Sequence, residues 1–478
     1  MMKKSTAVNF IYNMIYQISL VILPLITSPY LSRVIGPDGL GKYSYAYSTA
    51  YYFYMFAMLG INNYGNRTIA AIRDNKNEMD HSFSRIYYFQ ILSSVFSTVI
   101  YGLYCFFTNT QLAFVQIFYV ASAILDINWF YFGIEEFKIT VIRKTVIKII
   151  TTCCIFMFVK SVGDLITYAL IIAIGELLGQ AYMWFYIPKF IHFKKVPFKD
   201  IISGTKEILV LFIPIIATSI YRYMDKIMLG TLGTMNDVGQ YDYAEKIIMI
   251  CLGCMTALGT VMLPKMANLI ANNKIDEMQR YLRNSMQFAM MMAFPITFGL
   301  AAVSHRLALV YLGEGYEKCG EAMLFLSLTV IPIAWANVIR TQYLIPNSKD
   351  KEYVVSVIIA AVANFILNFC LIPQYGLNGA MVGTITAEFS VAIIQTLYIR
   401  KNLPISKYLK DSIGFYISGV VMYFIVRLVL NVTNDNILGL IIAVAVGTVS
   451  YVFFVGLTAY FSKNFIYNMI KDRFVKDI

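Results

Sequence analysis

One stretch of the chain combines hydroxyl, basic and acidic side chains at helical spacing within an otherwise apolar segment. It contains Thr218, Ser219, Arg222, Asp225 and Lys226. Residues three or four apart share one face of an α-helix, so these side chains form a polar stripe. A guanidinium binds phosphate through paired hydrogen bonds, which makes Arg222 a candidate phosphate ligand on the wall of a hydrated cavity, with Lys226 beside it. An internal ion pair between Arg222 and Asp225 is the alternative, and the two interpretations are compatible.

Further side chains with binding chemistry lie elsewhere in the chain. Asn13 and Gln17 belong to an uncharged polar stripe near the N-terminus, and Tyr51 lies in the next apolar segment. An amphipathic ring suits a sugar ligand, although simple packing explains Tyr51 equally well. Arg33 and Lys246 lie near the ends of apolar segments, where they would reach the mouth of a cavity or form its solvated rim.

Two carboxylates stand alone inside apolar segments. These are Glu176 and Glu388, and Asp225 adds a third acid within the charged stripe. A charge in hydrocarbon is costly, so such acids are candidates for carrying a coupling proton or ion. A partnered, purely structural carboxylate is the alternative for each.

The chain lacks the patterns that would indicate an enzyme or a metal centre. Its seven cysteines and three histidines show no metal-ligand spacing. No Gly-rich phosphate loop followed by Lys-Ser/Thr occurs, which argues against ATP hydrolysis. No loop is much longer than roughly 20 residues, so there is little room for the catalytic loop of a glycosyltransferase or polymerase. These absences favour transport over catalysis.

The composition requires that lipid solvate much of the molecule. Of 478 residues, 59% are hydrophobic and only 14% are charged. The apolar runs are continuous for roughly 20 residues, which predicts membrane-spanning helices rather than a barrel. We therefore predict an all-α integral membrane protein with about fourteen spans. The expected helices are 8–32, 42–61, 83–107, 112–133, 145–162, 165–187, 207–230, 241–262, 285–305, 322–343, 353–372, 378–399, 411–431 and 436–461.

The distribution of basic residues tests this map. If the N-terminus is inside, roughly 30 of the 39 Lys and Arg lie in inner segments and about six in outer ones. This bias agrees with the positive-inside rule and predicts that both termini are cytoplasmic, in a bacterial inner membrane. The net charge of +12 follows from it, so anionic headgroups explain the basic character and nucleic-acid binding is not expected.

The sequence also repeats itself. Gly41–Ala46 (GKYSYA) and Gly239–Ala244 (GQYDYA) lie 198 residues apart. This spacing predicts two six-helix lobes in the same orientation, related by a pseudo-twofold axis along the membrane normal. The expected divisions are an N-lobe at 1–200, a C-lobe at 201–403, and two added helices with a tail at 404–478.

Four segments have the character of family motifs. The most specific is Thr27–Gly41 (TSPYLSRVIGPDGLG). The others are Gly65-Asn66-Arg67 with Ile69-Ala70, Asp225–Gly230 (DKIMLG) and Pro373–Ala380 (PQYGLNGA). These segments resemble Wzx-type polysaccharide flippases, which belong to the multidrug/oligosaccharidyl-lipid/polysaccharide exporter (MOP) superfamily, and Thr27–Gly41 resembles the first outer loop of that family. The similarity covers the first twelve expected helices.

The resemblance implies a transporter that moves undecaprenyl-diphosphate-linked oligosaccharide repeat units outward by alternating access, for capsule, exopolysaccharide or O-antigen synthesis. It implies membrane lipid and the polysaccharide polymerase or export machinery as partners. It also implies a proton or sodium gradient as the energy source and no bound cofactor. The related lipid II flippases carry an essential arginine within helix 1, where this chain has Thr27-Ser28-Pro29. Lipid II is therefore a less favoured cargo, and a cation-coupled drug antiporter of the same superfamily remains the main alternative.

Overall fold

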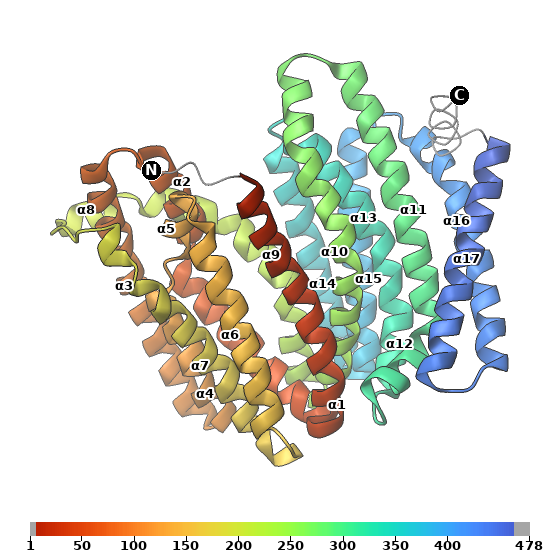
Figure 1. Ribbon diagram of the computed structural model, residues 1–478, viewed down its shortest axis with the longest axis horizontal. Coiled ribbons are helices and arrows are strands. Elements are labelled where there is room, and N and C mark those ends of the chain that lie inside the picture. Colours follow the sequence, from red (N-terminus) through yellow and green to blue (C-terminus); the bar gives the residue numbers. More distant parts are fainter. Residues whose placement is uncertain (1–5, 463–478) are drawn as a thin grey trace. The chain divides into compact units, whose positions relative to one another are not determined.

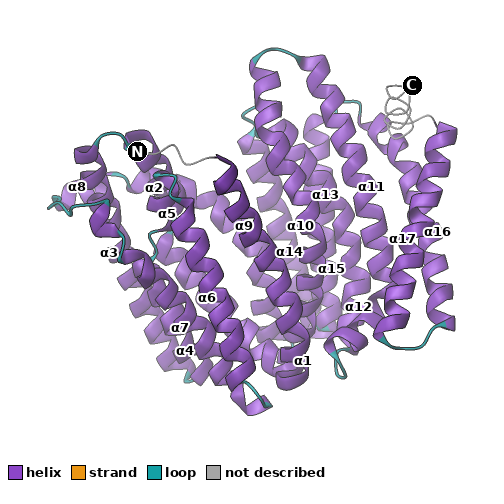
Figure 2. Cartoon of the chain, viewed as in Figure 1, coloured by secondary structure: helices purple, strands orange, loops and turns teal. Residues whose placement is uncertain are grey.

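The chain is helical throughout the part that the structure describes. The computed structural model describes the backbone of residues 6–462 and the side chains of residues 23–460, except residues 221, 254, 256, 257, 260 and 261. Within these residues there are helices and connecting loops and no β-strand (Figure 2). The all-α prediction is confirmed.

Two compact units make up the chain, Met1–Gly230 and Thr231–Ile478. Over its described residues, from Thr6 onward, the first unit contains nine α-helices and two short 3₁₀ turns (Figure 1). They are α1 Thr6–Met58, α2 Ile61–Ile72, α3 Lys76–Thr108, α4 Gln111–Leu125, α5 Asn128–Gly133, α6 Phe137–Phe158, η1 Val162–Asp164, α7 Leu165–Trp184, η2 Ile187–Lys189, α8 Phe198–Ser203 and α9 Thr205–Leu232, whose last two residues fall in the second unit. The expected lobes at 1–200, 201–403 and 404–478, and their symmetry, stay predictions.

Helix α1 is two helices joined by a break at Gly36. Gly36 has φ 77° and ψ 169°, a conformation that glycine reaches without steric cost. Pro37 follows it and has no backbone N–H to continue the hydrogen-bond ladder. In Figure 1 the red end of the chain turns back at this point. The helices expected at 8–32 and 42–61 are thus separated by a sharp break rather than a loop.

Two expected helices differ from the prediction in ways that matter below. The helix expected at 112–133 is interrupted, because α4 ends at Leu125 and α5 begins at Asn128. Asp126 makes the break, since its Oδ1 accepts the backbone N–H of Asn128 at 3.0 Å. The helix expected at 145–162 is α6, which begins at Phe137 and ends at Phe158. Basic residues assigned to the preceding loop therefore lie on the helix.

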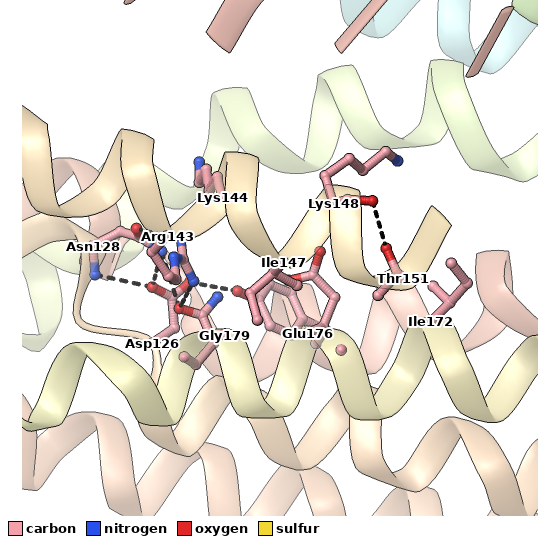
Figure 3. A pocket seen from close by; sticks show the side chains of 13 residues that line it. Asp126, Asn128, Arg143, Lys144, Ile147, Lys148, Thr151, Ile172, Glu176 and Gly179 are labelled. Carbon is pink, nitrogen blue, oxygen red and sulfur yellow. Dashed lines mark hydrogen bonds between the residues drawn. The ribbon is translucent and has the colours of Figure 1, made fainter. Parts of the chain in front are cut away.

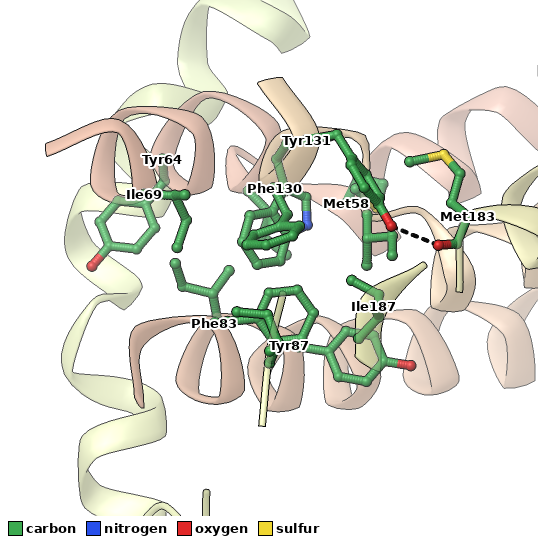
Figure 4. Close-up of a cluster of buried hydrophobic side chains, with 14 of the residues drawn as sticks. Met58, Tyr64, Ile69, Phe83, Tyr87, Phe130, Tyr131, Met183 and Ile187 are labelled. Carbon is green, nitrogen blue, oxygen red and sulfur yellow. Dashed lines mark hydrogen bonds between the residues drawn. The ribbon is translucent and has the colours of Figure 1, made fainter. Parts of the chain in front are cut away.

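The short helix α5 is anchored by an aromatic core (Figure 4). Trp129, Phe130 and Tyr131 are fully buried and pack in one cluster with Phe83 of α3. The Tyr131 hydroxyl also donates to the backbone carbonyl of Met183 at 2.6 Å. Because the side chains of these three consecutive residues are fixed by packing, the residue before them, Asn128, is held in place as well.

Up to Ser462, where the described residues end, the second unit contains eight α-helices and three short segments of 3₁₀ or π geometry. They are α10 Met235–Ala271, α11 Ile275–Leu307, η3 Ala308–Leu312, α12 Glu317–Leu326, η4 Ser327–Thr329, α13 Val330–Ile339, η5 Arg340–Leu344, α14 Asp350–Tyr375, α15 Leu377–Ile399, α16 Ile405–Val432 and α17 Ile437–Ser462. Arg283 of α11 and Asp411 of α16 form a two-point ion pair with N···O distances of 2.6 and 2.9 Å. The helix expected at 322–343 is the succession α12, η4, α13 and η5.

Ten helical segments in the described residues are long and apolar enough to cross a membrane. They coincide with ten of the fourteen expected spans. Side chains such as Phe106 and Phe107 are 75% and 82% exposed, which suits contact with lipid. The chain is therefore a multi-pass membrane protein. The spans expected at 8–32, 42–61, 145–162 and 241–262 stay predictions.

Candidate functional site

Five polar side chains, four of them buried, form a network in the first unit. Arg143 of α6 donates from Nη1 to Gln180 Oε1 of α7 at 2.8 Å and from Nη2 to Asn128 Oδ1 at 3.0 Å. Asp126 Oδ1 accepts from the Asn128 side-chain amide at 2.5 Å. Its Oδ2 accepts from the Tyr54 hydroxyl of α1, also at 2.5 Å. The buried cation and the buried anion are thus linked through neutral amides.

Arg143 is a buried charge without a direct counter-ion. Its side chain is only 3% exposed, and among the described residues it makes no ion pair. Its Nε has no hydrogen-bond partner in the part of the chain that the structure describes. Burying a charge without a partner of opposite sign costs several kcal/mol, as an order of magnitude. Asp126, in contrast, has both carboxylate oxygens satisfied.

Neighbouring polar groups fix the position of this network. The side-chain amide of Gln90 on α3 donates to the backbone carbonyls of Ala123 and Asp126 at 2.7 and 2.8 Å. The Gln90 Oε1 in turn accepts from the Trp129 indole N–H at 2.9 Å. The break between α4 and α5 is therefore held from two sides, which orients Asp126 and Asn128 toward α6.

Small residues on α7 let it approach α6 closely. A Cβ built on Gly175 would lie 2.5 Å from Thr151 Cγ2, a distance that real Cβ contacts do not adopt. A Cβ built on Gly179 would meet Ile147 and Arg143 at 3.5 and 3.6 Å, which is ordinary contact. Gly175 thus sets the spacing of α6 and α7, as small residues do between membrane helices.

A cavity of about 320 Å³ lies beside the network. Figure 3 shows the Arg143 side chain turned toward Asn128, whereas Lys144 and Lys148 point to the other side of α6. The side chain of Glu176 is exposed and contributes a carboxylate to the same wall. The full lining is Tyr54, Asp126, Asn128, Arg143, Lys144, Ile147, Lys148, Thr151, Ile172, Gly175, Glu176, Gly179 and Gln180.

Tyrosine rings connect this network to helix α9 within the first unit. Tyr54 stacks on Tyr119 of α4, with centroids 5.0 Å apart, and Tyr119 contacts Tyr47, also at 5.0 Å. Tyr47 lies 6.4 Å from Tyr223 of α9, and Tyr223 stacks on Tyr51 at 3.9 Å. We call these five residues the tyrosine tract. Their ring contacts run without a gap from the lining of the α6–α7 cavity to the polar stripe of α9.

The polar stripe of α9 lies at the far end of the tract. The Arg222 side chain is exposed, and no ion pair joins it to a carboxylate among the described residues. The Arg222 guanidinium carbon lies 5.9 Å from the centroid of the Tyr223 ring. Asp225 and Lys226 are buried, at 2% and 8% exposure. The arginine and the aromatic residue predicted as ligands thus lie together.

The remaining predicted residues are dispersed. Arg33 is exposed and donates to the backbone carbonyl of Pro29 at 3.0 Å. In the second unit, Lys246 is paired with Asp242 at 2.5 Å, and Glu388 is half-buried on α15. The side chains of Asn13 and Gln17 fall outside the described residues. The roles of all these residues stay predictions.

Sequence reasoning missed the centre of the buried network. Asp126, Asn128, Arg143 and Gln180 were not among the predicted site residues, and the basic residues of α6 were counted as loop charges. One signal was present, since Lys144, Lys148 and Thr151 follow helical i, i+4, i+7 spacing.

Comparisons with known proteins agree with the fold and indicate the family. A family model described as polysaccharide biosynthesis protein matches residues 6–270. A putative O-antigen transporter of Shigella dysenteriae is 22% identical over 78% of this chain and 94% of its own length. A putative O-antigen transporter of Escherichia coli (strain K12) is 22% identical over 84% of this chain and 98% of its own.

Solved structures with the same fold are membrane transporters. The lipid II flippase MurJ in an inward closed conformation has a TM-score of 0.77 at 15% identity, covering 94% of this chain and all of that one. An inward-facing multidrug resistance MATE family transporter of the MOP superfamily has a TM-score of 0.59 at 13% identity, covering 82% of this chain and 99% of its own. These likenesses establish the fold that the chain shares with them.

Proposed function

The chain belongs to the polysaccharide biosynthesis protein family, and from this membership we propose that it carries undecaprenyl-diphosphate-linked oligosaccharide repeat units across the bacterial inner membrane. Movement would run from the cytoplasmic to the outer face and supply the synthesis of a surface polysaccharide. The membership confirms the resemblance inferred from the sequence. The curated relatives are named as transporters and flippases, which agrees with a chain that is not an enzyme.

The physical problem is to move a charged, hydrated headgroup through hydrocarbon. An ionised group loses tens of kcal/mol of hydration, as an order of magnitude, on entering a medium of low dielectric constant. A protein can replace that water with cationic and hydrogen-bonding side chains while the polyprenyl tail stays in lipid. The first unit supplies cationic and hydrogen-bonding side chains on α9 and on the helices beside it.

One observation carries the proposal: the exposed Arg222 lies 5.9 Å from the ring of Tyr223, which is stacked on the ring of Tyr51. A guanidinium without a competing carboxylate is available to a diphosphate, and it can bind two phosphate oxygens at once. Aromatic faces beside it suit the apolar faces of sugar rings. Lys226, Arg33 and Lys246 remain proposed basic ligands, and Asn13 and Gln17 proposed sugar contacts.

A deletion strain tests this function directly. Without the protein, we expect lipid-linked repeat units to accumulate where an impermeant glycan-oxidising enzyme cannot reach them in intact cells. The wild-type chain should restore their accessibility and the surface polysaccharide. An outward-accessible pool of repeat units in the deletion strain would contradict the proposal.

Arg222→Ala tests the phosphate ligand in that strain. We expect this variant to abolish export, although its expression and melting temperature stay at the wild-type level. The reason is that the diphosphate loses the guanidinium that binds two of its oxygens. Arg222→Lys should restore export only in part, since an ammonium cannot make the two-point contact. Wild-type export by Arg222→Ala would remove Arg222 from the proposed site.

A cation-coupled drug antiporter is the second candidate, and the acids in the first unit favour it. Asp126 and Asp225 are buried and Glu176 lies in the cavity wall, as a cation carrier would require. Resistance to cationic dyes, gained with the chain and lost with Asp126→Asn, would support this candidate. A lipid II flippase is a further alternative, because the fold is shared with MurJ. Rescue of peptidoglycan synthesis after loss of a native lipid II flippase would support it.

The energy source, orientation and partners form part of the same proposal. We propose that a proton or sodium gradient drives transport, with Asp225, Glu176 and Glu388 as coupling groups. Both termini would be cytoplasmic, and the polymerase or export machinery would receive the product.

A further inference from the structure

We propose that an open groove at the start of α9 binds one anionic phospholipid of the membrane, with the phosphate at Lys206 and an acyl chain along the apolar part of the groove. The lining belongs to the first unit and runs from the end of α8 into α9. This inference goes beyond the proposed function, because it assigns the groove to a lipid of the bilayer and not to the transported repeat unit.

The lining of this groove changes from polar to apolar along α9. Lys206 is its one charged residue, and the hydroxyls of Ser203 and Thr205 belong to the same end. Ile216, the last lining residue, follows Lys206 by ten positions, which is roughly 15 Å along a helix. The remaining lining residues are Ile202, Leu209, Val210, Phe212 and Ile213. A phospholipid has the same order of parts, a charged headgroup followed by an apolar chain.

Packing within the first unit holds α9 on the side next to this groove. A Cβ built on Gly60 would lie 2.1 Å from the backbone oxygen of Ile208, so α9 lies directly against the turn between α1 and α2. The rings of Phe212 and Phe56 are also in contact, with centroids 5.5 Å apart. Three apolar side chains of the groove are nevertheless about half exposed, namely Leu209, Val210 and Ile213. An acyl chain would remove their apolar surface from contact with polar groups.

The charge of the segment that leads into the groove indicates an anionic occupant. Between positions 189 and 206 there are five lysines and one carboxylate, that of Asp200. Lys195, Lys199 and Lys206 are exposed, and within the described residues none of them makes an ion pair or a hydrogen bond. Glu207 follows Lys206 but does not line the groove. Lysines near a membrane surface attract anionic headgroups, which favours an anionic over a neutral lipid.

Contacts with α3 fix this segment and leave an apolar face of α8 open. The backbone N–H of Lys194 donates to the Ser84 hydroxyl at 2.9 Å, and the Lys194 ammonium group donates to Asn77 Oδ1 at 3.1 Å. Phe198 and Ile202 of α8 are exposed and lie four positions apart, on one face of the helix. Apolar side chains beside lysines are typical of a helix at the membrane interface. The positive-inside bias predicts that this interface is the cytoplasmic one.

Quenching of a tryptophan placed in the groove tests the site without transport. Full-length Ile213→Trp is purified and placed in phosphatidylcholine nanodiscs that contain, at equal mole fractions, brominated phosphatidylglycerol or brominated phosphatidylcholine. Bromine quenches a nearby indole, and the unmodified chain with its three tryptophans measures the background. We expect the anionic lipid to be enriched at this position about fivefold over the zwitterionic one, the value of one lysine near a headgroup. Adding Lys206→Gln should bring the two lipids within about twofold of each other.

Two control variants separate this groove from the general lipid boundary. Val449→Trp places the tryptophan at an exposed position of α17 and should be quenched equally by the two lipids. Lys407→Gln, combined with Ile213→Trp, changes an exposed lysine outside the groove and should keep the preference. If the melting temperature shows that Ile213→Trp is not folded, Val210→Trp replaces it, because Val210 is also an exposed lining residue.

Three outcomes would overturn the lipid site. They are equal quenching by the two lipids in the groove, a preference of the same size at Val449→Trp, and a preference that survives Lys206→Gln. Relief of the quenching by an equimolar amount of undecaprenyl diphosphate would also overturn it, by assigning the groove to the carrier of the repeat unit. Because no step of this assay involves export, its result does not depend on the outcome for the deletion strain.

Discussion

At the residue scale, the first unit separates two kinds of basic group. Arg222 is exposed and has no carboxylate partner among the described residues, whereas Arg143 is buried and held by two amides. An exposed guanidinium can bind and release a ligand with little reorganisation. A buried guanidinium fixed at both Nη atoms instead joins the side chains of α5, α6 and α7.

The stacked pair of Tyr51 and Tyr223 allows a test of the aromatic surface. Tyr51→Ala removes a ring whose centroid lies 3.9 Å from that of Tyr223, and we expect export to fall roughly three- to tenfold, the value of one aromatic contact. Tyr51→Phe keeps the ring and should export normally. The measurement is the rate at which repeat units become accessible outside the cell.

Packing and ligand binding by Tyr51 are separated by stability. If Tyr51→Ala lowers the melting temperature of the purified protein and export falls only in proportion to folded protein, the ring is structural. An unchanged melting temperature with reduced export would assign it to the ligand.

At the element scale, Gly175 controls how closely α6 and α7 approach. Gly175→Ala would place a methyl group 2.5 Å from Thr151 Cγ2, and we expect it to lower the free energy of unfolding by about 1–3 kcal/mol through overpacking. The measurement is thermal or denaturant unfolding of the purified chain.

Gly179 is the matched control for this prediction. The Cβ of an alanine at this position would lie 3.5 Å or more from its neighbours. The gain of about 1 kcal/mol in helix propensity therefore decides the sign of the change in stability. Gly179→Ala should be as stable as the wild type or slightly more so. Equal destabilisation by the two substitutions would show that helix spacing is not the cause.

The elements were largely predictable from the sequence, while their interruptions were not. Apolar runs placed ten spans that the structure also contains, because hydrophobic length is a local property. The break at Asp126 depends on a side chain that accepts a neighbouring backbone N–H, and hydropathy does not register such a bond. The start of α6 at Phe137 was missed because Arg143 and Lys144 resembled loop charges, whereas the fold turns them toward a polar network and a cavity.

The candidate site divides in the same way. Arg222 and Tyr51 could be found because charge and aromatic character stand out in an apolar segment. The network of Asp126, Asn128, Arg143 and Gln180 joins four elements, and its members are separated by up to 54 positions in the sequence. Only the packing of α4, α5, α6 and α7 brings these residues together.

At the scale of the whole molecule, orientation is open to a direct test. The positive-inside bias predicts that Lys195 faces the cytoplasm and that Asn434 faces outward, and both side chains are exposed. A membrane-impermeant maleimide should therefore label Asn434→Cys in intact cells and Lys195→Cys only after permeabilisation. The unmodified chain, with its native cysteines, measures the background. Labelling of Lys195→Cys in intact cells would reverse the assigned orientation.

The break at Gly36 has a consequence for how the chain is inserted. It divides the helical stretch Thr6–Met58 into two helices, which the predicted topology makes two crossings in opposite directions. The direction of each later crossing depends on the number of crossings before it. The break at this single residue therefore decides whether that number is odd or even. If Gly36 failed to break the helix during synthesis, every loop downstream would lie on the opposite side of the membrane. The basic residues of those loops would then violate the positive-inside rule.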